Sequence, residues 1–392
     1  MRITWKRRIV RISQSILLLF PVVCHSAVVS AAAWQHQPVN PAGGGNYSSL
    51  RIDGTGNAHV SYIDEDEHLL KYSFWDHKLD KWFTMTLDTS GGFCSLILDS
   101  KGHPHISYLD YGSGKLKYIR WNGSSWDKQT LQIRAKEIFF YTSITLDAHE
   151  KPVISYYEYW GTGDNYSLHL RNVAWTGEYW ATQTVDSTPG SGKFNSIVTD
   201  MLGNPHVAYA NVASENASLR YASWNGKAWD VEVLEGAVTT GAPNLPVFSV
   251  SMVMDKQNVP HIAYTDVRNR LVKYATKRGG KWELEVVDPI EHEAYPDRNG
   301  IALDDEGRPY ISYYDAGRGR LKLAFRTNGK WTSELVDQDF AGLNSSLQIA
   351  QGSIWLTYAD PTGRGVVFAH RALDTQSAAA APPAAKAESP SK

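Results

Sequence analysis

Three side chains that could cleave an acidic sugar chain lie within seven positions of one another: His292, Tyr295 and Arg298. Elimination from a uronate polysaccharide needs a base for the sugar C5 proton, an acid for the leaving oxygen and a cation that neutralises the carboxylate. Histidine, tyrosine and arginine can fill these roles. The spacing therefore supports one hypothesis, a polysaccharide lyase with these residues as its catalytic set.

Hydrolysis of a glycosidic bond would instead need two opposed carboxylates. Glu158, Glu291 and Glu293 are candidates. Because the chain has 41 acidic residues, these three do not by themselves indicate a glycosidase.

A second set of residues suits the binding of a sugar without its cleavage. Aromatic faces give apolar contact to sugar rings, and arginines bind carboxylate or sulfate through paired hydrogen bonds. Two alternatives stay open, because the aromatics could form a hydrophobic plug and the arginines could be solvated turn residues. The candidates are Tyr47, Phe93, Tyr141, Phe194, Phe248, Arg298 and Leu343, which start equivalent segments, together with Tyr157, Trp160, Arg268 and Arg318.

The elements that carry these residues are seven copies of one repeat, about 45 to 55 residues apart. The clearest copy begins at Ser95 and reads Ser-Leu-Ile-Leu-Asp-x-x-Gly-x-Pro-His-Ile-Ser-Tyr-x-Asp. It divides into four short alternating segments bounded by turn residues, at 95–99, 105–110, 116–121 and 126–132. Four strands in a repeat of this length predict an all-β fold, a seven-bladed β-propeller with four-stranded blades. One tyrosine recurs in every copy: Tyr62, Tyr108, Tyr156, Tyr209, Tyr264, Tyr313 and Tyr358.

The two ends of the repeat region predict how the ring closes. The seventh copy supplies three strands, at 346–350, 354–360 and 365–372, and lacks the fourth. Residues 34–40 precede the first complete copy and resemble a fourth strand. We therefore expect the N-terminal strand to complete the last blade, since an unclosed blade would expose a strand edge.

Loop lengths distinguish the two faces of the predicted propeller. The turn between first and second strands has the same length in all seven copies, so we call that side the constant-turn face. The connections between blades, such as 235–247 and 288–298, vary in length, and so does the second-to-third-strand loop at 157–166. Because binding residues concentrate on variable loops over a rigid scaffold, we expect the site on this variable-loop face.

Other recurring residues have a structural interpretation. Small residues in the first strands suit a crowded axis, the acidic residues that end the second strands suit turn capping, and the histidines suit bonds between neighbouring strands. The chain has no His-Glu-x-x-His motif and no cysteine pair, so we expect no metal and no cofactor. The small residues are Ser49, Ser95, Ser143, Ser196, Ser251, Gly300 and Ser345; the acidic or amide residues are Asp64, Asp110, Glu158, Asn211, Asp266, Asp315 and Asp360; the histidines are His59, His105, His206 and His261.

This pattern resembles the secreted bacterial seven-bladed propellers whose repeats are described as sialidase-like or neuraminidase-type. The resemblance covers residues 34 to 373 and implies the architecture. Sialidases carry Ser-x-Asp-x-Gly-x-x-Trp between third and fourth strands, whereas here an Asp-x-x-Gly turn joins the first and second strands. No Phe-Arg-Ile-Pro motif occurs either. The resemblance therefore does not extend to sialidase activity, and related propellers include lectins, protein-binding scaffolds and polysaccharide lyases.

Residues 1–33 predict a signal peptide, with four basic residues between Lys6 and Arg11, an apolar stretch from Ile16 to Val23 and small residues after it. The apolar stretch is shorter than the ~20 residues that a membrane span requires. We therefore expect a secreted or periplasmic protein with no membrane span after cleavage. Residues 374–392, rich in Ala, Pro and Ser, predict a disordered tail.

Composition narrows the class of partner. The chain has 39 basic and 41 acidic residues and a formal net charge of −2, which provides no long-range field for nucleic acid. We expect a monomer. The favoured hypothesis is a lectin-like module with one central site for an extracellular glycan; a polysaccharide lyase and a scaffold that binds a cell-envelope protein are the alternatives.

Overall fold

Antiparallel β-strands make up the described fold. The computed structural model describes residues 33–40, 44–131, 133, 137–162, 165–213, 217–236, 247–291, 298–338, 341–362 and 365–373, with the backbone alone at 137–140, 159–162, 165–167 and 247–248. Within these ranges the chain forms 28 strands, and no helix is present that could cross a membrane. Residues 1–32 of the predicted signal peptide and the predicted tail lie outside the described residues.

The strands group into seven sheets. Blade 1 contains β2 (Asn46–Ile52), β3 (Ala58–Asp64), β4 (Leu69–Asp76) and β5 (Lys81–Asp88), and blade 2 contains β6 (Gly92–Leu98), β7 (Pro104–Asp110), β8 (Lys115–Trp121) and β9 (Trp126–Thr130). Blade 3 contains β10 (Glu137–Leu146), β11 (Pro152–Thr162), β12 (Asn165–Trp175) and β13 (Trp180–Asp186), and blade 4 contains β14 (Ser191–Thr199), β15 (Pro205–Asn211), β16 (Ser218–Trp224) and β17 (Trp229–Gly236). Blade 5 contains β18 (Val247–Met254), β19 (Pro260–Asp266), β20 (Leu271–Arg278) and β21 (Lys281–Pro289), and blade 6 contains β22 (Gly300–Leu303), β23 (Pro309–Asp315), β24 (Arg320–Thr327) and β25 (Lys330–Asp337). Blade 7 contains β26 (Leu343–Ala350), β27 (Ser353–Asp360), β28 (Gly365–Ala372) and β1 (Gln35–Pro38).

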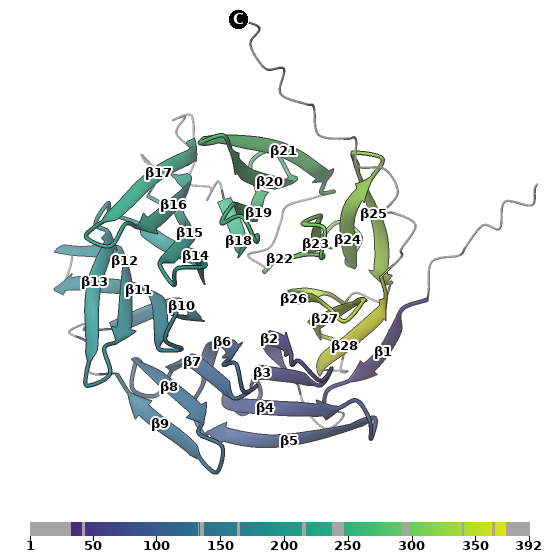
Figure 1. The fold of residues 1–392 in the computed structure, drawn as a ribbon, viewed down its shortest axis with the longest axis horizontal. Helices are drawn as coiled ribbons and strands as arrows, with labels where there is room; N and C mark the ends of the chain where they lie inside the picture. Colours follow the sequence, from purple (N-terminus) through teal and green to yellow (C-terminus); the bar gives the residue numbers. More distant parts are fainter. Residues whose placement is uncertain are drawn as a thin grey trace, which may run out of the picture. The chain divides into compact units, whose positions relative to one another are not determined.

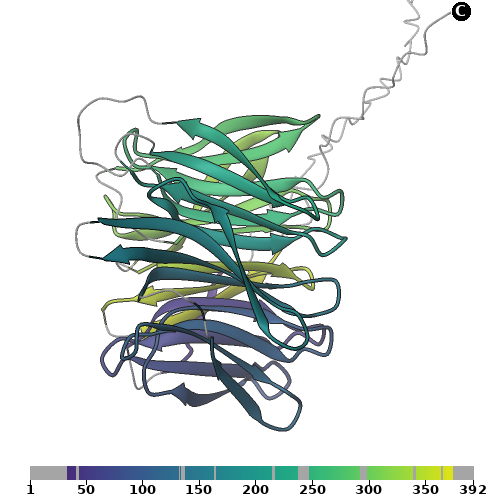
Figure 2. The ribbon, with the colours of Figure 1, turned by 90° about the vertical axis from the view of Figure 1, so that its left-hand side faces the viewer.

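Each sheet is an antiparallel meander, and the sheets surround a central axis. The first strand of every blade lies innermost and the fourth lies at the rim (Figure 1), with turns at both ends of the strands (Figure 2). Second strands such as β3 and β7 are buried along their whole length, because neighbouring blades cover both of their faces, whereas β5 at the rim is largely exposed. The prediction of an all-β, seven-bladed propeller is confirmed.

The N-terminal strand closes the ring, as predicted. In β1, Gln35 to Pro38 pair antiparallel with β28, and the Val39 N–H donates to the Val366 carbonyl at 2.8 Å. Val39 is buried in a hydrophobic cluster with Val366 and Phe368. Trp34 extends the closure to blade 6, where its indole N–H donates to Glu334 at 3.2 Å.

A belt of hydrogen bonds joins the first strands around the axis. At five places a serine Oγ accepts the backbone N–H of the next blade, which explains why small hydroxyl residues recur there. In blade 7 the serine is Ser346, whereas alignment of the repeats predicts Ser345. The turn between β26 and β27 is shorter than in the other blades, since Ala350 pairs with Ser353 there, whereas Ile52 pairs with Ala58 in blade 1. The expectation of one turn length in all seven copies is therefore wrong for blade 7. The five bonds are Leu96 N–H to Ser49 (3.0 Å), Ile144 to Ser95 (3.3 Å), Ile197 to Ser143 (3.2 Å), Met252 to Ser196 (3.1 Å) and Leu50 to Ser346 (3.1 Å).

A second set of hydrogen bonds joins neighbouring blades, and we call each of its tyrosine–acid pairs a clamp. The buried tyrosine of a second strand donates its hydroxyl to an acidic residue at the end of the preceding blade, and a lysine or arginine of the third strand often joins the same carboxylate. The tyrosine–acid pairs are Tyr108–Asp88 (2.5 Å), Tyr209–Asp186 (2.7 Å), Tyr264–Glu235 (2.6 Å), Tyr358–Asp337 (2.6 Å) and Tyr313–Asp288. The recurring tyrosine is thus part of the blade interface.

The recurring histidines bond to neighbouring strands, as predicted. Nδ1 of His59, His105, His206 and His261 lies 2.5 to 2.6 Å from a tyrosine hydroxyl of the adjacent third strand. Five of the seven acidic or amide residues that end the second strands accept backbone N–H groups of their own turns, for example Asp110 from Gly112 at 2.9 Å. Of the other two, Glu158 pairs with Arg171, and Asp315 Oδ1 has no partner among the described residues. Burial lowers the pKa of His105 to about 4, because a cation at this position would be desolvated.

Stability is expected to fall as the pH drops from 7 to 5. An unfolded histidine takes up a proton near pH 6.5, whereas folded His105 does so only near pH 4, so the unfolded state binds more protons in this window. His105 alone should remove about 2 kcal/mol between pH 7 and pH 5. Urea unfolding at both pH values should show that His105→Gln loses about 2 kcal/mol less stability than the parent between pH 7 and pH 5. The exposed control His149→Gln should lose as much stability as the parent. An unchanged pH dependence in His105→Gln would refute this assignment.

Candidate functional site

The start of each first strand presents one side chain at the mouth of the central channel on the variable-loop face. Two residues before the belt position, the backbone takes a positive φ: 52° at Tyr47, 40° at Phe93, 63° at Tyr141 and 52° at Phe194. In blades 5 and 7 the residue with this conformation is Ser249 (59°) or Asn344 (51°), so Phe248 and Leu343 precede it by one. Because this conformation recurs with different side chains, it is a property of the fold. It directs the side chain at this position toward the channel mouth.

The aromatic residues of blades 1 to 4 form a continuous arc. Ring centroids are 4.4 Å apart for Tyr47 and Phe93, 5.0 Å for Phe93 and Tyr141, and 4.5 Å for Tyr141 and Phe194. Phe93 and Phe194 are each only 5 % exposed, whereas Tyr47 and Tyr141 are half-buried. The two phenylalanines therefore support the arc, and the two tyrosines carry the part of it that a ligand could touch.

Tyr111, which the sequence analysis missed, extends this arc outward. It follows Asp110 in the loop between β7 and β8, is 44 % exposed and meets Phe93 edge-on at 6.3 Å. Its ring lies over Gly92, where a Cβ would come within 2.5 Å of it. Burial against the arc, with Tyr47 and Glu65 nearby, raises the pKa of Tyr111 to about 12. In the sequence, the signal for Tyr111 is an aromatic residue directly after Asp110, the aspartate that ends the second strand.

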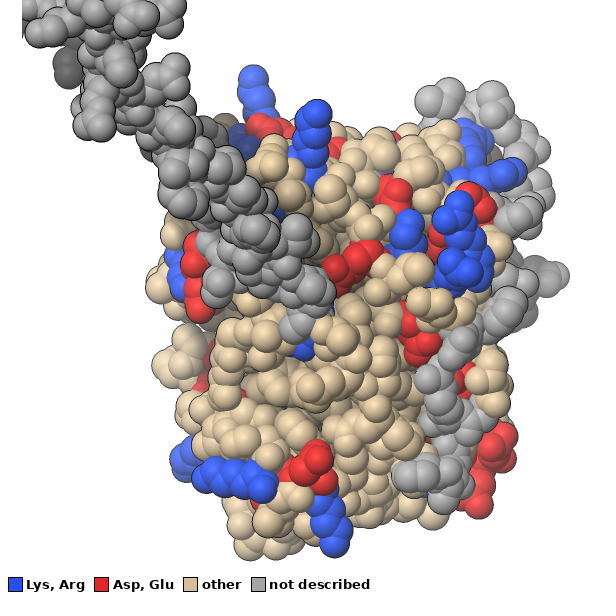
Figure 3. Space-filling model, turned by 90° about the vertical axis from the view of Figure 1, so that its right-hand side faces the viewer, with Lys and Arg blue, Asp and Glu red and all other residues tan. Residues whose placement is uncertain are grey.

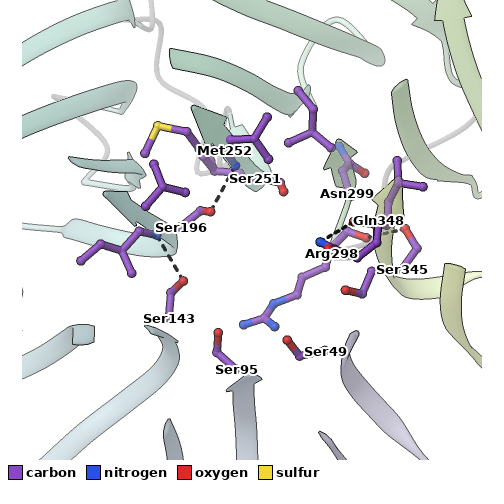
Figure 4. A pocket seen from close by; sticks show the side chains of 18 of the residues that line it. Ser49, Ser95, Ser143, Ser196, Ser251, Met252, Arg298, Asn299, Ser345 and Gln348 are labelled. Atoms are coloured by element: carbon purple, nitrogen blue, oxygen red, sulfur yellow. Dashed lines mark hydrogen bonds between the residues drawn. The ribbon is translucent and has the colours of Figure 1, made fainter. Parts of the chain in front are cut away.

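Arg298 lies opposite the arc and reaches across the ring from blade 6. Its guanidinium donates to the carbonyls of Cys94 in blade 2 (3.3 Å) and Thr142 in blade 3 (3.5 Å), and Figure 4 shows the side chain extending over the axis. Burial lowers its pKa, while Cys94, Tyr141 and Tyr47 act in the opposite direction. The arrangement places a fixed positive charge beside two tyrosine rings at the channel mouth.

Three of the other predicted binding residues are described with their side chains. Tyr157 is buried, and Arg268 is exposed in the loop that follows β19. Arg318 is exposed and forms an ion pair with Glu291 at 2.5 Å, so one candidate carboxylate and one candidate arginine bind each other. The side chains of Trp160 and Phe248, and the whole of His292 and Tyr295, lie outside what the structure describes.

Blade 3 departs from the repeat. Glu158, at the end of β11, is buried, and Arg171 Nε lies 3.1 Å from its carboxylate. Burial raises the pKa of Glu158, although Arg171 opposes the shift. Tyr156, which stands where other blades have a clamp tyrosine, has no hydrogen-bond partner for its hydroxyl among the described residues. Among the described residues, Tyr156 and Tyr62 are therefore the two recurring tyrosines without the acidic partner that the other five have.

Charges on the visible side of the propeller are mixed. Figure 3 shows Lys and Arg interspersed with Asp and Glu and separated by uncharged surface. This agrees with the near-zero net charge and gives that side no single-sign patch. Among the described residues, no group of three His, Cys, Asp or Glu side chains could hold a metal ion.

Comparison with known proteins identifies the fold. No protein-family model and no curated protein sequence matches the chain. An ulvan lyase of a polysaccharide lyase family matches with a TM-score of 0.53 and 13 % identity over 84 % of this chain and 90 % of that one. Polysaccharide lyase Uly1 matches with a TM-score of 0.52 and 11 % identity over 86 % and 91 %.

A third similar structure is AofleA from Arthrobotrys oligospora, with a TM-score of 0.51 and 15 % identity over 78 % of this chain and 90 % of that one. At these identities the similarity establishes the propeller architecture alone. The resemblance drawn from the repeat is thereby confirmed at the level of architecture.

Proposed function

We propose that this protein is a ligand-binding propeller that recognises an extracellular carbohydrate at the mouth of its central channel, on the variable-loop face. Arg298, held beside Tyr47 and Tyr141, is the observation that carries the proposal. A tyrosine ring suits the apolar face of a sugar, and a guanidinium suits its carboxylate or sulfate. We therefore propose an acidic polysaccharide as the ligand and export from the cytoplasm as the route by which the protein meets it.

The asymmetry of the mouth supports one site for each chain. Blades 1 to 4 contribute aromatic residues there, whereas blades 5, 6 and 7 contribute Ser249, Arg298 and Asn344. A lectin with seven equivalent sites would need the same binding residues in every blade. A single site centred near the axis fits this distribution.

Retention on a panel of neutral and acidic polysaccharides tests the proposal, with ultraviolet absorbance recorded for unsaturated uronate ends. We expect retention on an acidic polysaccharide with no rise in absorbance. A rise would favour the lyase hypothesis, and its loss in His292→Ala would assign the base. Absence of both retention and cleavage across the panel would contradict the proposal and favour a protein partner.

Tyr111→Ala supplies a second test. Because Tyr111 is 44 % exposed and lies at the outer end of the arc, its removal should leave the fold intact and weaken retention about fivefold to tenfold, equivalent to about 1–1.4 kcal/mol. Tyr179→Ala is the matched control, because Tyr179 is a 62 % exposed tyrosine in the turn before β13. If Tyr111→Ala and Tyr179→Ala are retained equally, the aromatic arc is not part of the binding site.

A further inference from the structure

We propose that the central channel binds a small inorganic oxyanion between Arg51 and Arg298, at a site that shares Arg298 with the proposed carbohydrate site and adds Arg51 to it. The two arginines stand in the first strand of blade 1 and just before that of blade 6, and both line one cavity of about 120 Å³ on the axis. None of the described residues lining this cavity is Asp or Glu. Two positive charges therefore share one small cavity, which is partly open to solvent.

The belt serines supply hydrogen-bond donors to the same cavity. A hydroxyl has one hydrogen to donate and two lone pairs to accept with. At Ser49, Ser95, Ser143 and Ser196 the oxygen accepts a backbone N–H, which leaves the hydroxyl hydrogen for another partner. These serines line the cavity and surround Arg298 in Figure 4. Hydroxyl hydrogens and guanidinium N–H groups are the donors that an oxyanion requires.

Arg51 is the cavity residue whose surroundings point most directly to a bound anion. Its guanidinium donates to the Leu50 carbonyl at 2.7 Å, a neutral acceptor, and it makes no ion pair with the described acidic residues. Arg51 is half-buried, and desolvation lowers its pKa to about 10 with no carboxylate opposing the shift. A partly desolvated cation gains stability from an accompanying anion.

The acidic residues nearest in sequence are occupied elsewhere. Asp53 ends the same strand region and accepts the backbone N–H groups of Thr55 (2.8 Å) and Asn57 (2.9 Å) within its own turn. Its second oxygen binds the Asn57 side chain at 2.9 Å. Arg51 therefore faces the channel and not this carboxylate.

The size of the cavity limits the class of ligand. It exceeds the ~10–15 Å³ that holds one water and is smaller than the ~300 Å³ at which ligand pockets begin. A polysaccharide does not fit, whereas sulfate or phosphate does. Arginine favours oxyanions over halides because its planar fork of N–H groups binds two oxygens at once.

Equilibrium dialysis of the full chain with labelled sulfate, in a gluconate buffer whose anion is larger than sulfate and carries a single charge, tests the proposal. We expect saturable binding of one sulfate per chain. Arg51→Gln should weaken it at least tenfold, and Arg278→Gln, a surface arginine paired with Glu283 at 3.5 Å, should leave it unchanged. No saturable binding, or equal binding in Arg51→Gln, would mean an adventitious ion only and overturn the proposal.

Gln348→Glu keeps Arg51 and supplies an internal anion instead. Gln348 lines the same cavity two residues after Ser346, as Arg51 does two residues after Ser49. This variant should lose sulfate binding and, in gluconate, unfold at a higher temperature than the parent. Normal sulfate binding in a folded Gln348→Glu, or a lower unfolding temperature of Arg51→Gln in gluconate, would contradict a half-buried charge that awaits an anion. Arg51→Gln should retain polysaccharide binding, because Arg51 is not part of the proposed carbohydrate site, so failure here is distinguishable from failure of the proposed function.

Discussion

Asp288→Ala is expected to destabilise the protein by about 2–3 kcal/mol, because it removes a half-buried carboxylate that accepts charge-assisted hydrogen bonds. Asp288 accepts hydrogen bonds from Tyr313 and Lys322, and from Ser333 at 2.9 Å. Its removal leaves a tyrosine hydroxyl and a lysine without their acceptor at the seam between blades 5 and 6. Urea unfolding at pH 7 measures the change.

The chain contains its own control for this clamp. Tyr313→Phe should cost about 1–2 kcal/mol, whereas Tyr156→Phe, whose hydroxyl has no hydrogen-bond partner among the described residues, should change stability by less than about 0.5 kcal/mol. Equal costs for the two substitutions would show that the tyrosine–acid pair contributes nothing.

The pH dependence of the clamp has a defined sign. Burial would raise the pKa of Asp288, but the hydrogen bonds from Lys322 and Tyr313 outweigh it and lower the pKa. The stabilisation is therefore complete above the ordinary carboxyl range and is lost as the pH falls below about 4. Asp288→Ala should lose less stability in that acid range than the parent protein.

Removal of the closing strand is the second large expected effect. A chain beginning at residue 44 loses the pairing of β1 with β28, the buried Val39 and the Trp34–Glu334 bond. At about 1 kcal/mol for each backbone hydrogen bond and about 2 kcal/mol for the valine, the loss is on the order of 5 kcal/mol. This approaches the whole stability of many domains. We expect little soluble protein, with a sharply lowered urea midpoint for what remains.

Deletion of 374–392 is the matched control, since the sequence predicts almost nothing to bury there. It should leave the urea midpoint unchanged. A chain beginning at residue 44 with the midpoint of the parent would refute the account of ring closure.

The repeat made the fold predictable from the sequence. Because the tyrosine and the turn residues recur at fixed offsets, the strands of blade 2 were predicted at 105–110 and 116–121 and lie at Pro104–Asp110 and Lys115–Trp121. The register failed in blade 7. There the belt serine is Ser346 and not Ser345, because the turn between β26 and β27 is shorter than in the other blades and alignment on the recurring tyrosine assumes one turn length.

The candidate site was less predictable from the sequence. The exposure of a side chain and its contacts across the ring both depend on tertiary structure. Phe93 and Tyr141 look alike in the sequence, yet Phe93 is 5 % exposed while Tyr141 is half-buried. The contact of Arg298 with Cys94 and Thr142 joins residues more than 150 positions apart, which no local pattern encodes. The lyase hypothesis involving His292 and Tyr295 stays a prediction.

Titration calorimetry with a defined oligosaccharide of the retained polysaccharide tests the proposed site at the channel mouth. We expect one site per chain, at least tenfold weaker binding in Arg298→Gln and unchanged binding in Arg308→Gln, whose arginine bonds Asp304 on the constant-turn face. Seven equivalent sites, or an affinity for Arg298→Gln equal to that of the parent, would contradict a single carbohydrate site at the channel mouth.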